Sequence, residues 1–180
     1  MLIERQRSCL LVIDVQERLL PAMAEGGNVV ANAAVLIKAA NRLGVPVLLS
    51  EQYPKGLGPT VAALSALVPE GPAVAKTEFS CAAAPGYLDR LRATGRDQLV
   101  LAGIEAHVCV LQTALQFRSL GYAVFVVADA VSSRKPESVG LALARMREAG
   151  AVPVTTEMVL FEWLGRAGTA EFKELSALIR

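Results

Sequence analysis

The chain has 180 residues, of which 53% are hydrophobic and 19% are charged, and its formal net charge is +1 at pH 7. This length predicts one domain over residues 1–180 with a single large core, and the apolar excess favours fully covered parallel strands and a subunit interface. Because lysine and arginine form no cluster, neither nucleic acid nor an acidic membrane surface is an expected partner.

Cysteine content and hydropathy indicate the compartment. The three cysteines show no paired spacing, which argues against a disulfide framework and for a reducing environment. No secretory signal precedes the first apolar run, and no run reaches the roughly 18 residues typical of a membrane span. The expected location is therefore cytoplasmic, with no membrane partner.

Short apolar runs alternate with segments of helical periodicity along the chain. The runs predict six strands, at residues 8–15, 46–51, 73–77, 98–102, 122–128 and 152–155. Helices are expected at residues 29–43, 61–68, 85–94, 107–120, 137–149, 157–166 and 169–179, with Asn28 as the cap of the first. This alternation predicts an α/β fold, a three-layer α/β/α sandwich around a mostly parallel six-stranded sheet.

The order of the strands decides which residues meet. Right-handed crossovers and one reversal of direction place the first and fourth strands side by side, in the order 3-2-1-4-5-6. Ligands bind such sheets in the crevice at the carboxyl ends of the strands. Asp14 ends the first strand, Lys76 lies near the end of the third, and Cys109 follows the fourth. We therefore expect these three residues at one crevice.

Each of the three also has an ordinary structural interpretation. Asp14 can simply cap or turn the chain, most lysines are solvated surface charges, and free cysteine usually behaves as a small buried hydrophobe. Lys76, however, is flanked by small and apolar residues. An ammonium group at this edge of the sheet would stabilise a carboxylate and a thiolate together.

Cys109 lies where a loop becomes a helix. Unpaired backbone N–H groups and the positive end of the helix dipole at such a place favour the thiolate and can hold an oxyanion. The only histidine, His107, is two positions earlier and points to another side of the helix, so we expect the base to be a carboxylate from elsewhere. Cys81 is a rival nucleophile, but no helix start follows it directly, and Cys9 inside the first strand is interpreted as core.

Loops near this edge are candidates for the substrate pocket. The segment 51–60 is rich in proline and glycine and is expected to line the crevice, with a plain surface connection as the alternative. Five residues are possible contacts for a substrate: Gln16, Gln52, Tyr53, Phe79 and Ser80. The turn after the first strand lacks the G-x-G-x-x-G pattern, which weakens the interpretation as a nucleotide-binding module.

Several motifs, in their order and spacing, resemble one known superfamily. They are VIDVQ around Asp14, KTEFS around Lys76, GIEAHVCVLQTA around Cys109, and the later DAVSSR and TTEMVLFEWL. With these motifs the chain resembles the isochorismatase-like cysteine hydrolases over most of its length. The segments EQYPKGLG and GIEAHVC resemble those of the YcaC-like, isochorismatase-domain-containing branch, here with Ser50 in place of a threonine.

The resemblance implies a catalytic triad of Asp14, Lys76 and Cys109. In that triad Asp14 would take the thiol proton, Lys76 would favour the charged pair, and Cys109 would attack an amide or similar carbonyl to form a thioester intermediate. The resemblance also implies a cis peptide between Ile104 and Glu105. It implies an oxyanion hole formed by the backbone N–H groups of Glu105 and Cys109.

Departures from relatives narrow the chemistry. Nicotinamidases carry an Asp-x-His metal site after the second strand, where this chain reads SEQYPKGLG, so we expect no metal and no cofactor. True isochorismatases lack the cysteine nucleophile, so Cys109 argues against that activity. The side chains of Glu105 and His107 can reach the pocket, although His107 equally fits a structural hydrogen-bonding role.

Two functional hypotheses follow. The first is a metal-free cysteine amidohydrolase that acts on a small-molecule carboxamide or related acyl compound. The second is a catalytically weak oligomeric binding or assembly protein that keeps the hydrolase fold, which the apolar surplus favours and the complete triad opposes. Because the family commonly forms dimers, tetramers or larger rings, we expect a homo-oligomer under either hypothesis.

Overall fold

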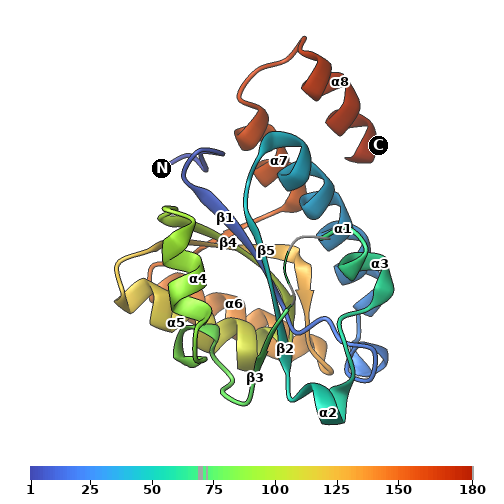
Figure 1. Cartoon of the computed structure of the whole chain (residues 1–180), viewed down its shortest axis with the longest axis vertical. Coiled ribbons are helices and arrows are strands. Elements are labelled where there is room, and N and C mark those ends of the chain that lie inside the picture. Colours follow the sequence, from blue (N-terminus) through green and yellow to red (C-terminus); the bar gives the residue numbers. More distant parts are fainter. Residues whose placement is uncertain (69–70, 72, 180) are drawn as a thin grey trace.

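The computed structural model describes residues 1–68, 71 and 73–179, and these form one sheet of six strands in the order β3-β2-β1-β4-β5-β6 (Figure 1). Each neighbouring pair of strands runs in parallel. The strands are β1 (Ser8–Ile13), β2 (Val47–Gln52), β3 (Val74–Lys76), β4 (Gln98–Ile104), β5 (Ala123–Ser132) and β6 (Val152–Val154). The predicted strand order is confirmed, and the sheet is parallel throughout.

Helices cover both faces of this sheet (Figure 1). One side carries α1 (Gly26–Leu43), α3 (Ala62–Ser65), α7 (Thr156–Leu164) and α8 (Ala170–Ser176). The other side carries α4 (Tyr87–Ala93), α5 (Leu111–Ser119) and α6 (Pro136–Glu148). The three-layer α/β/α architecture is therefore confirmed. Short 3-10 turns complete the path: η1 (Leu20–Ala22), η2 (Cys81–Ala83) and η4 (Ala177–Ile179).

The central strands are buried on both faces. Every residue of β1 and β4 is buried, which explains why these segments are almost continuously apolar in the sequence. Alternate residues of β1 point to opposite faces: Leu10 and Val12 join the core under α1 and α7, whereas Leu11 and Ile13 join the core under α4, α5 and α6. Two apolar layers thus fix the sheet between the helices.

The first helix and the loop after β2 differ from the prediction. α1 starts at Gly26, Glu25 takes the N-cap position, and the Asn28 amide donates to Glu25 Oε2 at 2.7 Å, so Asn28 does not cap the helix. The loop after β2 contains one helical turn, α2 (Pro54–Leu57), where the sequence predicted no regular structure.

The helix that carries the nucleophile candidate also begins differently. Its first part is a π-helical turn, η3 (Ala106–Val110), in which the Val110 N–H reaches back five residues to Glu105 O. The α-helical part, α5, starts only at Leu111. β4 and β5 continue past their predicted ends at residues 102 and 128, as far as Ile104 and Ser132. Both strands therefore reach further toward the candidate site than the sequence predicts.

No helix among the described residues is both long enough and apolar enough to cross a lipid bilayer.

Gly103 allows β1 and β4 to approach each other next to the candidate site. Its φ is +126°, and a Cβ added there would clash with the carbonyl oxygen of Ile13 on the neighbouring strand. Only glycine combines that backbone conformation with the absence of a side chain. The position is therefore closed to every other residue type without movement of β1.

Gly103→Ala is expected to lower the free energy of unfolding by about 3 kcal/mol or more, because both the clash and the backbone conformation oppose alanine. Gly140→Ala, within α6 and with nothing within 4 Å of the added Cβ, is the matched control. It should raise the free energy of unfolding by about 0.5–1 kcal/mol. Urea unfolding followed by circular dichroism measures both variants, and equal stabilities would contradict the predicted clash.

Candidate active site

The carboxyl ends of neighbouring strands bring the three catalytic candidates to one edge of the sheet. Asp14 directly follows β1, Lys76 is the last residue of β3, and Cys109 lies in η3 just after β4. Between β1 and β3 runs β2, where Ser50 pairs in register with Ile13, the residue before Asp14. The site is thus assembled by strand order and register.

Asp14 is held in an unusual backbone conformation. Its φ is +54°, in the left-handed region that aspartate tolerates better than most residues with a side chain. Its backbone N–H donates to Ser50 O at 3.1 Å, and its Oδ1 accepts a hydrogen bond from Ser50 Oγ at 2.7 Å. The carboxylate is fully buried, so these contacts and those of Lys76 take the place of solvent.

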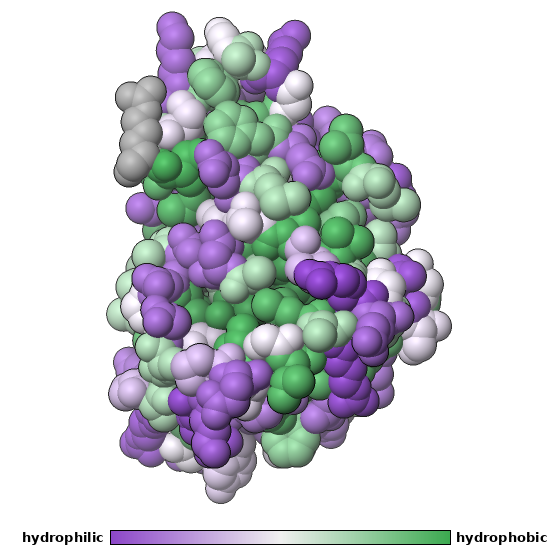
Figure 2. All heavy atoms as spheres, turned by 180° about the vertical axis from the view of Figure 1, so that it is seen from behind, coloured by the Kyte–Doolittle hydropathy of each residue, from purple (hydrophilic) through white to green (hydrophobic). Residues whose placement is uncertain are grey.

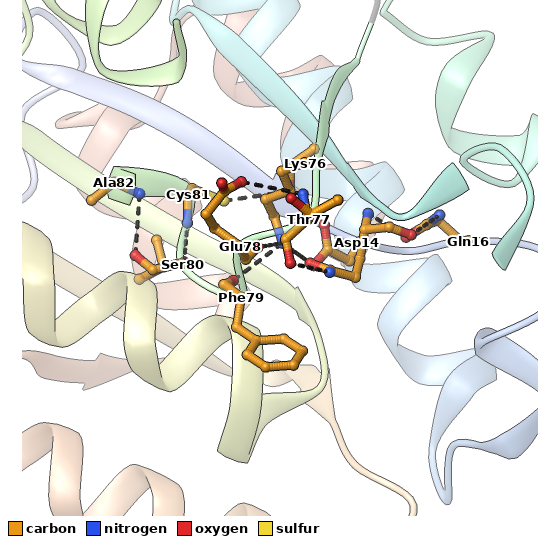
Figure 3. A network of polar contacts seen from close by, with 12 residues as sticks. Asp14, Gln16, Lys76, Thr77, Glu78, Phe79, Ser80, Cys81 and Ala82 are labelled. Atoms are coloured by element: carbon orange, nitrogen blue, oxygen red, sulfur yellow. Dashed lines mark hydrogen bonds and ion pairs between the residues drawn. The ribbon is translucent and has the colours of Figure 1, made fainter. Parts of the chain in front are cut away.

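Lys76 forms a buried ion pair with Asp14. Its Nζ lies 2.6 Å from Asp14 Oδ2, and neither side chain has solvent-accessible surface. The same Nζ donates to Gln52 Oε1 at 2.8 Å, to Phe79 O at 3.1 Å and to Glu78 O at 3.2 Å. Figure 3 shows the loop after β3 curling around the ammonium group to supply these carbonyls. A buried ion pair needs such additional hydrogen bonds to offset its loss of hydration.

Cys109 is 5% exposed. Burial raises its pKa well above that of an ordinary cysteine, the negative charge of Asp14 raises it further, and the positive charge of Lys76 acts in the opposite direction. The prediction that a helix start would favour the thiolate is therefore wrong for the resting protein. The desolvated thiol and the neighbouring carboxylate outweigh the helix dipole, whose first turn here is π-helical.

The arrangement can move a proton without changing the net charge of the site. Transfer from the Cys109 thiol to the Asp14 carboxylate would exchange one negative group for another beside the same Lys76 ammonium. Two groups that share a proton in this way titrate as a unit. The hydrogen bond between a nucleophile and its base often shortens only when substrate binds.

Cys81 and Cys9 are poor rivals for the nucleophile. Cys81 is fully buried, its Sγ donates to Ser50 Oγ at 3.4 Å, and burial raises the pKa of its thiol. Cys9 lies inside β1, where burial raises its pKa to about 12. Among the cysteines, Cys109 combines proximity to Asp14 with some access to solvent.

Two of the five possible substrate contacts hold the site together from inside. The Gln16 amide is fully buried, donates to Gln52 O at 3.0 Å and to Gly58 O at 2.7 Å, and accepts from the Gln52 N–H at 2.8 Å. Gln52 in turn binds Lys76. These bonds tie the loop after β2 to the end of β1, and a direct contact of either glutamine with substrate stays a prediction.

The other three differ in exposure. Ser80 is buried and caps η2 by accepting from the Ala82 N–H. Tyr53 and Phe79 are 55% and 52% exposed, and the Phe79 ring points away from the ion pair in Figure 3. A surface depression of about 400 Å³ lies at Tyr53, and its lining consists of Tyr53, Pro54, Lys55, Ala75, Lys76, Thr77, Glu78 and Pro85.

The segment between β4 and η3 has a second charged contact. The peptide bond between Ile104 and Glu105 is cis. Glu105 is 7% exposed, and its Oε2 accepts from the Arg134 Nε at 3.0 Å and from the Arg134 backbone N–H at 3.2 Å. His107 Nδ1 lies 2.9 Å from Ser133 Oγ, which fits the structural role considered for it. Both contacts fasten η3 to the end of β5.

Sequence reasoning did not assign roles to Ser50 or Arg134. A polar residue near the carboxyl end of the strand beside Asp14 was the available signal for Ser50. Arg134 had no such signal, because its partner Glu105 is 29 positions away and only the fold brings them together.

Among the described residues, no three His, Cys, Asp or Glu side chains are grouped so that they could hold a metal ion.

Lys76→Met is expected to lower the free energy of unfolding by about 3–5 kcal/mol, because it leaves Asp14 as an unpaired buried charge. The double variant Asp14→Asn, Lys76→Met removes both charges and should recover most of this loss. Denaturant titration measures both. At the exposed Arg7–Asp97 pair, Asp97→Asn serves as the control and should have a much smaller effect. A double variant no more stable than Lys76→Met would contradict an ionised pair.

Comparison with known proteins identifies the family. A model of the family described as "Isochorismatase domain" matches residues 8–158. Isochorismatase domain-containing protein 2 from Danio rerio is 42% identical over 175 residues, which cover 96% of this chain and 86% of that protein. The MAR1 ribonuclease structure from Caenorhabditis elegans has a TM-score of 0.93 at 38% identity, covering 99% and 92% of the two chains. The YcaC gene product from Escherichia coli, described as an octameric hydrolase of unknown specificity, has a TM-score of 0.93 at 27% identity and coverages of 99% and 90%. The chain therefore belongs to the family of isochorismatase-like hydrolases.

Proposed function

We propose that this chain is a metal-free cysteine hydrolase that cleaves a small amide or related acyl compound through a thioester intermediate. The observation that carries the proposal is the buried carboxylate of Asp14, which pairs with the Lys76 ammonium and lowers the acidity of the neighbouring Cys109 thiol. Such a carboxylate is an acceptor for the thiol proton. In this proposal Cys109 is the nucleophile, Asp14 is its base and Lys76 is the compensating cation.

Acylation begins when Asp14 takes the proton of Cys109 and the thiolate attacks the carbonyl carbon. Lys76 stabilises the site while the negative charge moves from carboxylate to sulfur. The charge then passes to the carbonyl oxygen, where the backbone N–H groups of Glu105 and Cys109 are the proposed donors. A donor of this kind typically contributes about 2.7–4 kcal/mol to transition-state stabilisation.

Collapse of the tetrahedral intermediate returns the proton. Protonated Asp14 donates it to the leaving nitrogen, so that ammonia or an amine departs and a thioester remains on Cys109. Asp14, again ionised, then takes a proton from water, and the hydroxide attacks the thioester carbonyl. The acid product leaves, and the proton on Asp14 restores the Cys109 thiol.

A small-molecule substrate suits this site better than RNA, the substrate class suggested by the name of the C. elegans relative. The chain carries a net charge of +1, so the general attraction for a phosphate backbone is weak. Its only histidine, His107, is engaged with Ser133. A carboxylate and thiol pair is matched to attack on an acyl carbon.

The second candidate is an oligomeric binding or assembly protein with little turnover. It is favoured by exposed apolar side chains, and Figure 2 shows apolar residues gathered over the middle of one face of the molecule with hydrophilic residues around them. The largest exposed apolar side chains include Leu120, Leu141, Met158 and Phe161. Against it stands the buried Asp14–Lys76 pair, which binding alone would not require.

Ammonia release across a panel of small primary amides tests the hydrolase. At least one compound is expected to turn over, and Cys109→Ala should lower that turnover at least about a thousandfold, because the remaining thiols of Cys9 and Cys81 are fully buried. Cys9→Ala, at a buried cysteine inside β1, is the matched control and should keep the activity. Intact-protein mass spectrometry after rapid mixing should detect an acyl adduct in the wild type.

Turnover that survives Cys109→Ala would contradict the nucleophile. No ammonia with any amide and no acyl adduct would favour the binding protein. Release of nucleotides from RNA by the wild type but not by Cys109→Ala would replace the amide with a phosphodiester as the substrate.

We also propose a homo-oligomer, in keeping with the apolar surface and with the octameric YcaC relative. Light scattering coupled to size exclusion should give a mass that is a multiple of the 19.0 kDa chain mass. The mass should persist at high salt, because apolar contacts are not screened. A single 19.0 kDa species at micromolar concentration would contradict this prediction.

A further inference from the structure

Both oxygens of the Asp14 carboxylate are engaged by side chains, and one of these has no role in the steps above. Oδ2 faces the Lys76 ammonium at 2.6 Å, and Oδ1 accepts from the Ser50 hydroxyl at 2.7 Å. Ser50 is 1% exposed, so water cannot replace it. The parallel register between β1 and β2 fixes Ser50 next to Ile13, and the Asp14 N–H binds the Ser50 carbonyl.

The direction of the Ser50 hydrogen bond is determined by its neighbours. An ionised carboxylate only accepts hydrogen bonds, so the hydroxyl proton of Ser50 must point to Asp14. The Ser50 oxygen then accepts from Cys81 Sγ at 3.4 Å. Thr113 Oγ1 holds the backbone of Cys81 by accepting from its N–H at 3.0 Å. Burial raises the pKa of Cys81, which keeps this thiol in its donor form.

We propose that Ser50 is a positioning residue for Asp14, holding the carboxylate in the orientation from which it takes the Cys109 proton. This inference rests on the proposed function. Ser50 keeps its own proton throughout: the proton that moves goes from the sulfur of Cys109 to Asp14. The hydroxyl acts only by donating a hydrogen bond that is stronger to the charged carboxylate than to the neutral acid.

The expected effect of Ser50 on pH dependence has a definite sign. The titratable groups that interact with Asp14 are Lys76 from β3, Cys81 from η2, Cys109 from η3 and Tyr87 from α4. Removing the Ser50 donor makes the ionised base less favourable. The acid limb of the alkylation profile should therefore move to higher pH.

The experiment is the rate of Cys109 alkylation by iodoacetamide between pH 4 and 10, followed on the full chain by peptide mass spectrometry. Ser50→Ala should shift the acid limb up by roughly one unit, as expected for a lost hydrogen bond to a charged group. It should also slow alkylation at neutral pH about tenfold, because the carboxylate is no longer held in its orientation toward Cys109. Ser50→Thr keeps the hydroxyl and should restore the wild-type profile.

Ser8→Ala is the matched control. Ser8 is fully buried in β1 at the opposite end from Asp14, and its hydroxyl donates to Glu4 O at 2.8 Å. Its loss should lower the melting temperature without moving the pH profile. If Ser50→Ala does not fold, Ser50→Cys supplies a weaker donor of similar size, and a shift in the same direction is expected.

Three results would overturn the inference, and the third can be told apart from the first two. A Ser50→Ala or Ser50→Cys profile that superimposes on the wild type, or a Ser8→Ala profile that shifts equally, removes Ser50 from the mechanism and leaves the proposed function standing. Absence of alkylation at Cys109 in the wild type over the whole pH range would remove the reactive thiol, and with it both the proposed function and the role of Ser50.

Discussion

The buried ion pair between Asp14 and Lys76 is the constraint on which the site depends. With no solvent at either side chain, the pair survives only because protein groups replace the lost water. Gln52 and the carbonyls of Glu78 and Phe79 surround the ammonium, and Ser50 binds the carboxylate. The loop after β3, the register of β2 and the end of β1 are all needed to supply these groups, so the chain around the site has little freedom.

The pair also bears on the pKa of the Cys109 thiol. A thiolate at Cys109 would stand beside the negative charge of Asp14 in a desolvated site, and its pKa is raised accordingly. In the proposed mechanism, reactivity depends on moving a proton from Cys109 to Asp14, which leaves the total charge beside Lys76 unchanged.

Sequence reasoning located the three principal residues, because a carboxylate after an apolar run, a lysine at a strand end and a cysteine after the fourth strand all fall at one edge of a doubly wound sheet. It failed where the outcome depends on contacts across the fold. The acidity of Cys109 follows from its burial, and the Glu105–Arg134 pair follows from strand pairing between β4 and β5. Neither has a local signal in the sequence.

The sequence by itself determined the six strands, their order, the family and the candidate reactive groups, because apolar periodicity and motif spacing can be recognised along the chain. Only the tertiary structure decided how those groups behave. Whether Cys109 carries a charge and what holds Asp14 depend on distances and desolvation set by residues 36 to 95 positions apart in the chain, as for Ser50 and Asp14 or Cys109 and Asp14. Electrostatic energy depends on separation in space and on burial, and neither follows from the order of the residues alone.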